Sequence, residues 1–548
     1  MTLNLPDLIR QSLFDELDAI KGMKTLIMDS VTMGIIDLAC SKSLIMKKEV
    51  FLFEDVTKFR QGRKRYKDPK LSHLKAIVVI RNVNENIEAL IYELSNNSYN
   101  SYHLFFTNRI DSMTIKRLAE ADMNEVVKGV KEIYMDIEPL LNNVFMLKPL
   151  EGVTKFNYKS ADIKRFSEGL SAATKLLRMT SSSILYQSTS LETDRIAHSL
   201  SSSLESSNGF SDEGVILILD RRFDPITPLV FNWTYFNLIH ELLGFNNNKV
   251  TFTDSSSKTT QTSFSTDGDE FYKQNIYADY GKFCSSIKRL VDDFQKRRNE
   301  HDNMDSLGDI KDFISRYPEF KKLSGIVDKH VSIVDEIAKK VQMRDLLNIS
   351  LLEQEILVSS NQSSIVNKLK RDLFPPPSQA ENTNIQRSDL FRMLLITALK
   401  LKDISFLSQI QASDVNTADI SCINEYIGRN FELFQKDNRI YPVSSNIINE
   451  FKTVENVYTR YQPRLKDVLN AVINGDIHHL NLNRYGNYSP SKKILVFVVG
   501  GLTCSEIALV HDLNKEQRAR IVVGGTSLLN SECFMKDIIQ TARATVPK

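Results

Sequence analysis

The sequence predicts an α/β protein of several domains, in which a mostly helical segment interrupts the second of two parallel sheets. Near the N-terminus, short apolar runs alternate with segments of helical period, which is the pattern of a parallel sheet covered by helices. Further apolar runs near residues 215 and 495 read as strands of one sheet, although they lie far apart in the chain. The length agrees, because 548 residues exceed what one hydrophobic core usually holds.

Four short apolar segments predict the strands of the first sheet. They read KTLIMD, EVFLFED, KAIVVIR and YHLFFTN, and they begin at Lys24, Glu49, Lys75 and Tyr102. Between them, residues 86–94 and 114–121 have the spacing of amphipathic helices. We therefore expect an N-terminal α/β domain at residues 1–136.

The second sheet is expected to be discontinuous. GVILILD (214–220) is a clear buried strand, and its expected partners are KKILVFVVGG (492–501) and ARIVVGGTS (519–527). The Ser/Thr-rich region at 180–211 reads as a helix broken by a linker. This organisation predicts a central α/β domain at 137–247 plus 477–548, and a mostly helical third domain at 248–476.

Two helices of the third domain are predicted to form a projecting hairpin at about residues 280–345. Apolar residues recur at helical spacing from Phe283 to Phe294, and again from Leu323 to Val341. Pro318 precedes the second stripe and is predicted to break or bend the chain. His330 lies on the apolar stripe, which favours a core or groove residue over a metal ligand. The prolines at 375–377 predict an exposed loop.

Composition argues against several classes of function. The net charge of +2 gives no global attraction to nucleic acid or to a membrane. The five cysteines include no CxxC pair, so we expect no disulfide framework, no zinc site and no cofactor. The longest apolar runs are too short to cross a membrane, and we expect a soluble protein that reaches membranes through partners.

Two motifs could bind a phosphate or perform catalysis. The glycine pairs at 500–501 and 524–525 follow strands but fit no phosphate-loop pattern, and tight turns are the favoured interpretation. In LDRRFDPITPL (219–229), Asp220 and Asp224 could perform acid–base catalysis, but the adjacent arginines and prolines favour a structural ion-pair corner. Because no familiar catalytic spacing occurs, an enzyme that binds a nucleotide at the glycine turns is the weaker alternative.

One basic run stands out. Residues 58–70, KFRQGRKRYKDPK, contain seven basic side chains and one acidic side chain. Such runs are usually solvated loops, and the functional alternative is an anchor for an acidic partner or an anionic membrane surface.

Several ordered motifs resemble the SM family, the Sec/Munc-type syntaxin-binding proteins, over essentially the whole chain. LDRRFDPITPLVFNWTY (219–235) is similar to the family signature LDR..D..TPL....TY, and HELLG, VFVVGGLTCSE and IVVGGTSLLNS follow in order. VENVYTRYQP, RYPEFKKLSG, HELLGFNNNK and RLAEAD resemble the endosomal and trans-Golgi branch of the family. The Ser/Thr-rich tract at 250–267 departs from that pattern.

The resemblance implies a fold, an activity and a set of partners. The fold would be an arch of three domains, and the chain would not be an enzyme. It would bind a syntaxin-like Qa-SNARE and assembled SNARE complexes, template their assembly, and work in endosomal and trans-Golgi traffic. We expect a cytoplasmic protein recruited peripherally through SNAREs, with no nucleic acid partner. An SM protein of the plasma-membrane route or of the vacuolar tethering complex is the alternative.

The resemblance also implies two binding surfaces. An apolar pocket for the N-terminal peptide of the syntaxin would lie on the helix at 114–119 and on a second helix expected at 124–134. Its residues would be Ile115, Leu118, Ala119, Val127 and Val130. Ordinary core packing is the alternative for Ile115.

A cleft would take the SNARE helices. Its residues would be Asp29, Arg63, Arg65, Lys67, Pro318 and His330. Asp29 could equally be a turn cap. Pro318 would be a hinge at the hairpin tip that switches the cleft between a closed syntaxin and other SNAREs.

Overall fold

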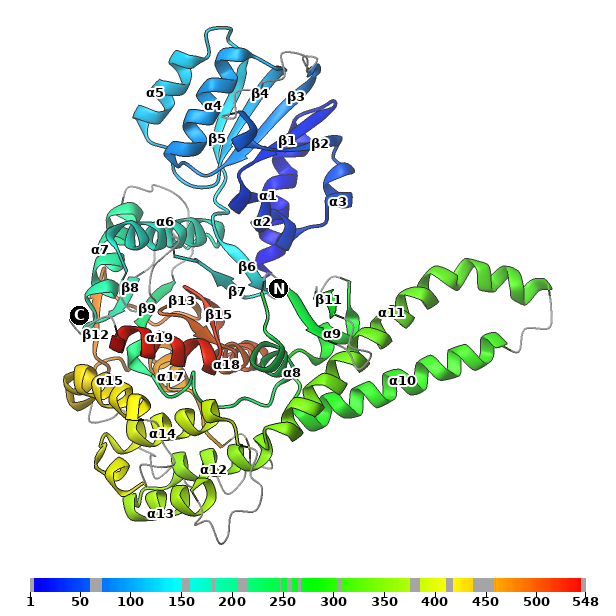
Figure 1. Ribbon diagram of the computed structural model, residues 1–548. Helices are drawn as coiled ribbons and strands as arrows, with labels where there is room; N and C mark the ends of the chain where they lie inside the picture. Colours follow the sequence, from blue (N-terminus) through cyan, green and yellow to red (C-terminus); the bar gives the residue numbers. More distant parts are fainter. Residues whose placement is uncertain are drawn as a thin grey trace. The chain divides into compact units, whose positions relative to one another are not determined.

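The computed structural model describes most of the chain, which forms two compact units (Figure 1). Unit 1 comprises Met1–Arg221, Asp467–Leu502 and Val510–Ser527, and unit 2 comprises Arg222–Lys466, Thr503–Leu509 and Leu528–Lys548. The described residues are 4–59, 71–149, 158–179, 183–205, 214–246, 248–253, 259–264, 268–302, 307–374, 385–410, 417–436, 458 and 460–543. The three-domain boundaries expected from the sequence stay a prediction.

The N-terminal part of unit 1 is a five-stranded parallel sheet in the order β2-β1-β3-β4-β5. All four predicted strands and both predicted helices are present. The strands are β1 (Lys24–Met28), β2 (Val50–Asp55), β3 (Leu71–Ile80), β4 (Tyr99–Phe106) and β5 (Val127–Glu132). The helices are α1 (Leu5–Ala19), α2 (Ser30–Ala39), α3 (Lys42–Met46), η1 (Val56–Phe59), α4 (Asn84–Asn96) and α5 (Ser112–Ala121).

Helices cover both faces of this sheet, which is why its central strands are continuous apolar runs. Leu26 and Met28 pack into the core that α1–α3 cover, whereas Ile27 packs into the core with α4 and α5. This alternation follows from the two-residue period of a strand.

The helix expected at 124–134 is wrong, because this segment forms β5, the edge strand beside β4. Val127 and Val130 are β-branched, and Gly129 between them has low helix propensity. The free edge of β4 supplies backbone hydrogen-bond partners, and these outweigh the weak helical pattern.

The remainder of unit 1 is a seven-stranded mixed sheet in the order β12-β8-β9-β13-β15-β7-β6. Its strands are β6 (Glu138–Leu141), β7 (Val144–Met146), β8 (Ser183–Gln187), β9 (Val215–Asp220), β12 (Leu482–Tyr485), β13 (Lys493–Val499) and β15 (Arg520–Gly525). β9 pairs with β13 in parallel, with Val215 opposite Ile494, and β13 pairs with β15. The predicted pairing of strands from residues near 215 and 495 is confirmed.

Two helices connect strands of this sheet in the chain: α6 (Ser160–Leu176) lies between β7 and β8, and α7 (Leu191–Glu205) lies between β8 and β9. The region predicted as a broken helix therefore contains strand β8 as well as α7. The C-terminal segments add β14 (Leu502–Thr503), β16 (Leu528–Leu529), α17 (Leu465–Asn474) and α18 (Cys504–Lys515).

Unit 2 is mostly helical. Its elements are η2 (Arg221–Phe223), α8 (Tyr235–Leu238), the π-helix η3 (Ile239–Leu243), β10 (Lys249–Thr253), β11 (Thr259–Ser263), α9 (Glu270–Asn275), α10 (Tyr280–Asp302), α11 (Leu307–Met343), α12 (Leu346–Val358), α13 (Gln362–Leu373), α14 (Arg387–Leu401), η4 (Ser405–Gln409), α15 (Thr417–Lys436) and α19 (Ser531–Arg543). β10 and β11 form an antiparallel hairpin within the Ser/Thr-rich tract.

The predicted helical hairpin is confirmed as α10 and α11, which extend side by side away from the other helices of unit 2 (Figure 1). The rings of Phe294 and Phe320 stack between the two helices with centroids 5.3 Å apart. Among the described residues, no helix is both long and apolar enough to span a bilayer.

The prediction that the chain breaks at Pro318 is wrong, because α11 begins at Leu307 and continues through Pro318 as one helix of 37 residues. A proline inside a helix removes one backbone hydrogen bond. The packing of α11 on α10 offsets that loss. The predicted loop at 375–377 lies outside the described residues.

Candidate functional site

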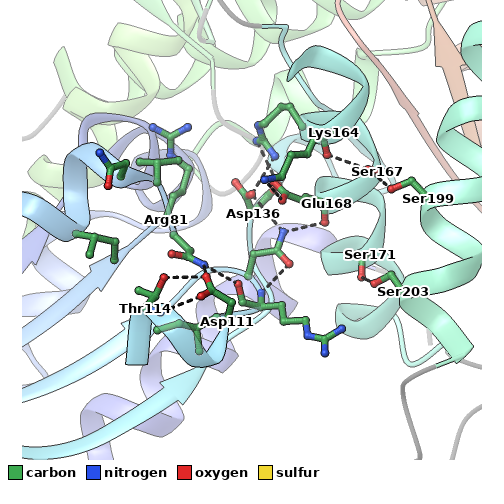
Figure 2. A pocket seen from close by; sticks show the side chains of 18 of the residues that line it. Arg81, Asp111, Thr114, Asp136, Lys164, Ser167, Glu168, Ser171, Ser199 and Ser203 are labelled. Atoms are coloured by element: carbon green, nitrogen blue, oxygen red, sulfur yellow. Dashed lines mark hydrogen bonds and ion pairs between the residues drawn. The ribbon is translucent and has the colours of Figure 1, made fainter. Parts of the chain in front are cut away.

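A polar pocket of about 630 Å³ lies in unit 1, beyond the carboxyl ends of β3 and β4 (Figure 2). Loops 81–84 and 108–114 line one side, and α6 and α7 line the other. The strand order reverses between β1 and β3, and open α/β sheets usually bind ligands at such a switch point. The pocket is therefore the first candidate for a ligand site in unit 1.

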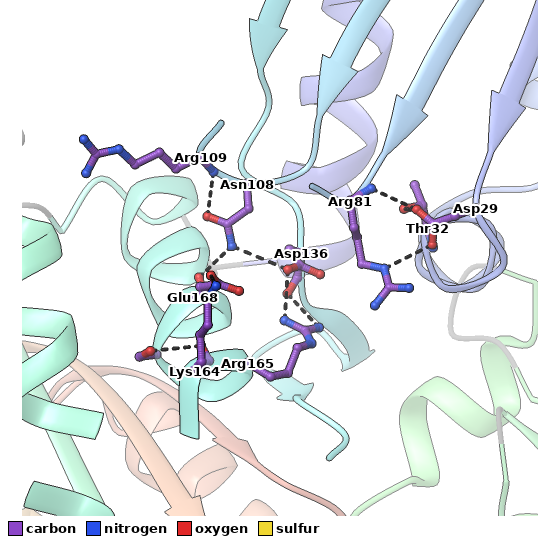
Figure 3. Close-up of polar contacts among 10 residues, drawn as sticks. Asp29, Thr32, Arg81, Asn108, Arg109, Asp136, Lys164, Arg165 and Glu168 are labelled. Carbon is purple, nitrogen blue, oxygen red and sulfur yellow. Dashed lines mark hydrogen bonds and ion pairs between the residues drawn. The ribbon is translucent and has the colours of Figure 1, made fainter. Parts of the chain in front are cut away.

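Asp29 fills the switch point with the protein's own carboxylate (Figure 3). It follows β1 and caps α2, accepting hydrogen bonds from the backbone N–H groups of Val31 at 3.1 Å and Thr32 at 3.2 Å. It also accepts from the backbone N–H of Arg81 at 2.9 Å, from Arg81 Nε at 3.1 Å and from Asn86 Nδ2 at 3.2 Å. Only 2% of Asp29 is exposed. This geometry supports the cap interpretation and leaves no place for a phosphate at the start of α2.

The second helix start beside the pocket is capped in the same way. Asp111 accepts from the backbone N–H of Thr114 at 2.8 Å and from its Oγ1 at 2.7 Å. These hydrogen bonds lower the pKa of Asp111 to about 2.

Asp29 gives a prediction for the pH dependence of stability. Although burial alone raises it, the nearby Arg81 charge and the hydrogen bonds hold the pKa of Asp29 below the usual 3.8. The ionised carboxylate therefore stabilises the fold above pH 3.8, and this contribution is lost as the pH falls through the lower folded pKa. We expect Asp29→Asn to cost about 2 kcal/mol at pH 7. The difference from the wild type should shrink below pH 3.8.

Urea denaturation at a series of pH values measures this effect. Asp18→Asn is a matched control, because Asp18 is an exposed ion-pair partner of Lys48 in the same unit. A gap between Asp29→Asn and wild type that stays constant from pH 7 to pH 3 would contradict the assignment.

A second buried carboxylate, Asp136, ties the segment after β5 to α6 (Figure 3). Its Oδ2 accepts from Arg165 Nη1 at 2.9 Å and from Asn108 Nδ2 at 3.4 Å, and Asn108 also donates to the carbonyl of Glu168 at 2.8 Å. Burial raises the pKa of Asp136, and the charges of Arg165 and Arg81 oppose that rise. These contacts join two segments of unit 1.

The pocket holds no catalytic arrangement among the residues that line it. Four of its five serines hydrogen-bond in pairs, Ser167 with Ser199 and Ser171 with Ser203, each at 3.0 Å (Figure 2). No histidine or cysteine lines it, so no nucleophile lies beside an imidazole base.

Most of the cationic side chains that line the pocket form ion pairs with carboxylates of unit 1. Arg81 pairs with Asp29, Arg165 with Asp136 and Arg117 with Glu88. Within the described ranges, no three His, Cys, Asp or Glu side chains are grouped to hold a metal ion.

The glycine pairs have structural roles. Gly500 and Gly501 have φ angles of +97° and +112°, and a Cβ on Gly500 would lie 2.6 Å from Cβ of Arg221. This confirms the turn interpretation for that pair. Gly524 and Gly525 instead lie inside β15, and a Cβ on Gly524 would collide with the Phe145 ring. For them the tight-turn prediction is wrong, because the requirement is close packing.

The two carboxylates of the corner in LDRRFDPITPL accept structural hydrogen bonds, and their pairing with the adjacent arginines stays a prediction. Asp220 accepts from Ser190 Oγ at 2.8 Å. In unit 2, Asp224 accepts from the backbone N–H groups of Thr227 and Arg464, each at 3.1 Å, and from the Tyr461 hydroxyl at 3.3 Å.

The five residues predicted to form the peptide pocket divide between α5 and the edge strand β5. Ile115 is 44% exposed and Val130 is 41% exposed, so neither is ordinary core. Ala119 is exposed and Val127 is partly buried. Leu118 is 4% exposed and belongs to the core with α4, so it cannot line a surface pocket.

Sequence reasoning missed two exposed apolar residues beside this group, Met113 at the start of α5 and Met123 just after it. Met113 was the available signal in the sequence, because it is an apolar residue beside the polar residues of the predicted helix.

The structure describes the side chains of two of the six predicted cleft residues, and both are buried. His330 is 0% exposed, so the cleft assignment is wrong for this side chain, and the core interpretation is confirmed. Asp29 is buried as described above. Arg63, Arg65 and Lys67 lie outside the described residues, and Pro318 is described only as part of the α11 backbone.

Comparison with known proteins identifies the class. The sequence model of the Sec1 family matches residues 24–537, and the chain belongs to this family. Vacuolar protein sorting-associated protein 45 of Rattus norvegicus is 34% identical, over 95% of this chain and 93% of the relative. The homologue from Arabidopsis thaliana is 30% identical, over 96% of each chain.

Solved structures agree with this assignment. The SM protein Vps45 in complex with the Qa SNARE Tlg2 has a TM-score of 0.83 and 28% identity, covering 100% of this chain and 99% of that one. The Unc18–syntaxin 1 complex from Monosiga brevicollis has a TM-score of 0.77 and 18% identity, covering 98% and 99%, and it supports the fold alone.

Proposed function

We propose that this chain binds a Qa-SNARE and promotes SNARE-complex assembly in endosomal and trans-Golgi vesicle traffic. The observation that carries the proposal is the likeness, over the whole length, to an SM protein solved with its Qa SNARE. The relatives of 30–34% identity support the same branch. An SM protein of the plasma-membrane or vacuolar tethering route is the alternative, and binding to a panel of Qa-SNAREs separates these routes.

The activity is binding, without bond making. The polar side chains of the pocket are engaged in serine–serine hydrogen bonds and ion pairs, and close packing at Gly500 and Gly524 leaves no room beside them. Both observations argue against the nucleotide-binding enzyme. Nucleotide-dependent thermal stabilisation of the purified chain would restore that alternative. Association with endosomal and trans-Golgi membranes would be peripheral and would depend on the SNARE partner.

The helices of unit 2 suit a helical partner. A SNARE helix presents apolar side chains every three or four residues, which pack along amphipathic helices. Val331 and Met343 on α11 and Leu347 on α12 are exposed apolar side chains. Holding a SNARE helix there reduces the entropy lost when the other SNAREs assemble on it. The basic run at 58–70 would steer acidic partners.

The N-terminal peptide of the Qa-SNARE would bind on α5 and β5, around Ile115, Ala119 and Val130. We expect Ile115→Arg to weaken peptide binding at least about 100-fold, because a charge would enter an apolar contact. Isothermal titration of the full chain with N-terminal peptides from several Qa-SNARE classes measures this.

Leu191→Arg is the control, because Leu191 is a large exposed apolar residue at the start of α7, outside the predicted pocket. Normal affinity of Ile115→Arg would move the peptide site elsewhere. If no peptide binds the wild type, the activity rests on helical surfaces alone, and titration with SNARE bundles becomes the deciding test.

A further inference from the structure

A buried polar network connects α11 to the segment that carries the family signature. His330 Nδ1 lies 2.6 Å from the Tyr235 hydroxyl, and His330 Nε2 lies 2.9 Å from Asp269 Oδ2. Asp269 also pairs with Lys329 and caps α9 through the backbone N–H of Tyr272 at 2.9 Å. Three elements, α8, α9 and α11, therefore meet at one imidazole.

The hydrogen-bond directions are fixed by chemistry. Asp269 is ionised and can only accept, so His330 Nε2–H donates to it. Burial lowers the pKa of His330, which keeps the ring neutral, and Nδ1 is then the acceptor for the Tyr235 hydroxyl. A rotation of α11 about its axis would break both hydrogen bonds at once.

Aromatic side chains pack around this buried network. The His330 ring lies 4.6 Å from the Phe271 ring and 6.2 Å from the Phe264 ring, and Tyr235 packs 4.7 Å from Phe283 of α10. An apolar side chain at position 330 would fill the same space but would form no hydrogen bond that fixes the rotation of α11. Polar groups in a core are known to select one arrangement among several of similar packing energy.

The neighbouring backbone is unusual as well. α8 continues into the π-helix η3, and α11 packs against it. π-Helices are rare and occur frequently at functional sites. Trp233, two residues before Tyr235, donates to Ser350 Oγ of α12 at 2.9 Å. The end of the signature segment (219–235) therefore makes hydrogen bonds to two consecutive helices, α11 and α12.

We propose that Tyr235, His330 and Asp269 form a latch that fixes the rotation of α11, and with it the face that the α10–α11 hairpin presents to a SNARE helix. From His330 the helix runs about 35 Å further to its start at Leu307, so a rotation about the helix axis at the latch turns the face that α11 presents along this whole length. The latch residues are positioning residues: they are buried and do not touch the partner. The functional consequence rests on the proposed SNARE binding.

The test measures helix position and function separately. One spin label is attached at Asp335→Cys on α11 and another at Ser363→Cys on α13. Pulsed electron paramagnetic resonance measures the distance between the two labels, which reports the position of α11. Both sites are exposed, and the accessible native cysteines Cys284, Cys422 and Cys533 are replaced by serine in the background. We compare Tyr235→Phe/His330→Leu, which removes the latch but keeps an apolar core, with His330→Gln, which keeps one donor and one acceptor.

We expect one narrow distance distribution in the wild type and a broadened or shifted one in the double variant. The double variant should slow assembly of SNARE complexes from purified SNAREs at least 10-fold, while its urea midpoint stays near that of the wild type. His330→Gln should recover much of both properties. Tyr280→Phe is the control, since Tyr280 lies in the same aromatic cluster and its side chain makes no hydrogen bond among the described residues.

Two results would overturn the latch: an unchanged distance distribution in the double variant, or a loss of assembly activity fully explained by unfolding. If the wild type accelerates no SNARE assembly, the proposed function fails, but the distance measurement still decides whether the latch orients α11. If the double variant does not fold, Tyr235→Phe alone, which removes only the hydroxyl, decides the question by the same distance.

Discussion

Replacing Arg392 with methionine should lower the free energy of unfolding of unit 2 by about 3–5 kcal/mol. Arg392 on α14 is fully buried and pairs with Glu353 of α12 and, at 3.6 Å, with Asp389. It also donates to the carbonyl of Leu229 at 2.7 Å. Removing the guanidinium leaves the Glu353 carboxylate in the core without a cation, whereas Asp389 keeps its ion pair with Arg344 at 2.8 Å, so the desolvated charge of Glu353 is the source of the loss. Chemical denaturation measures it.

A compensating change should identify the cause. Glu353→Gln removes this unpaired charge, while its amide oxygen can still accept from the backbone N–H of Phe231, now 2.9 Å from Glu353. We therefore expect Arg392→Met/Glu353→Gln to be more stable than Arg392→Met alone. Arg387→Met is the control, because Arg387 on the same helix forms an exposed ion pair and should cost less than about 1 kcal/mol. An equally small loss for Arg392→Met would refute the argument.

The second large effect is expected from Gly524→Ala in unit 1, at about 3 kcal/mol. A Cβ at this position would enter the space of the Phe145 ring. That ring is fully buried and stacks on Phe497 with centroids 6.2 Å apart, so it cannot move aside. The strand β15 would have to shift against β7, its neighbour in the sheet.

A double-mutant cycle with Phe145→Leu tests this explanation, because the two substitutions should be less harmful together than the sum of their separate effects. Gly129→Ala is the control: this glycine also lies in a strand, has no atom within 4 Å of its Cβ position, and should change stability by less than about 0.5 kcal/mol. Strict additivity in the cycle would show that the Phe145 ring is not the obstacle.

Strands buried on both faces were predictable from the sequence, and the edge strand β5 was not. KAIVVIR and GVILILD are uninterrupted β-branched and apolar runs, which only a sheet covered by helices explains well. The β5 sequence VKGVKE is half polar because one side of this edge strand faces solvent, so its local pattern resembles a helix surface. The strand β8 is buried and paired on both sides, and it was missed because it is short and lies within a serine-rich stretch.

The binding surfaces were predictable only as far as the family resemblance extended. It led to Ile115, whose exposure agrees with a surface site, and to His330, which is buried. Helical periodicity identified the stripe of His330 but could not show its partners, since Tyr235 and Asp269 lie 95 and 61 residues away in the chain. The polar pocket escaped prediction because its residues come from loops and helices that no local pattern connects.

The strand order of the seven-stranded sheet has a consequence for synthesis on the ribosome. β9 is made early, but its neighbour β13 emerges only after the whole segment 221–492 has been translated, and β7 must wait for β15 near the end. Until then the nascent chain carries two sets of strands with open edges, which are prone to pair with other chains. Such non-local closure is slow. Synthesis of residues 493–525, which carry β13 and β15, therefore determines when these open edges can be paired, and chaperones can shield the edges until that moment.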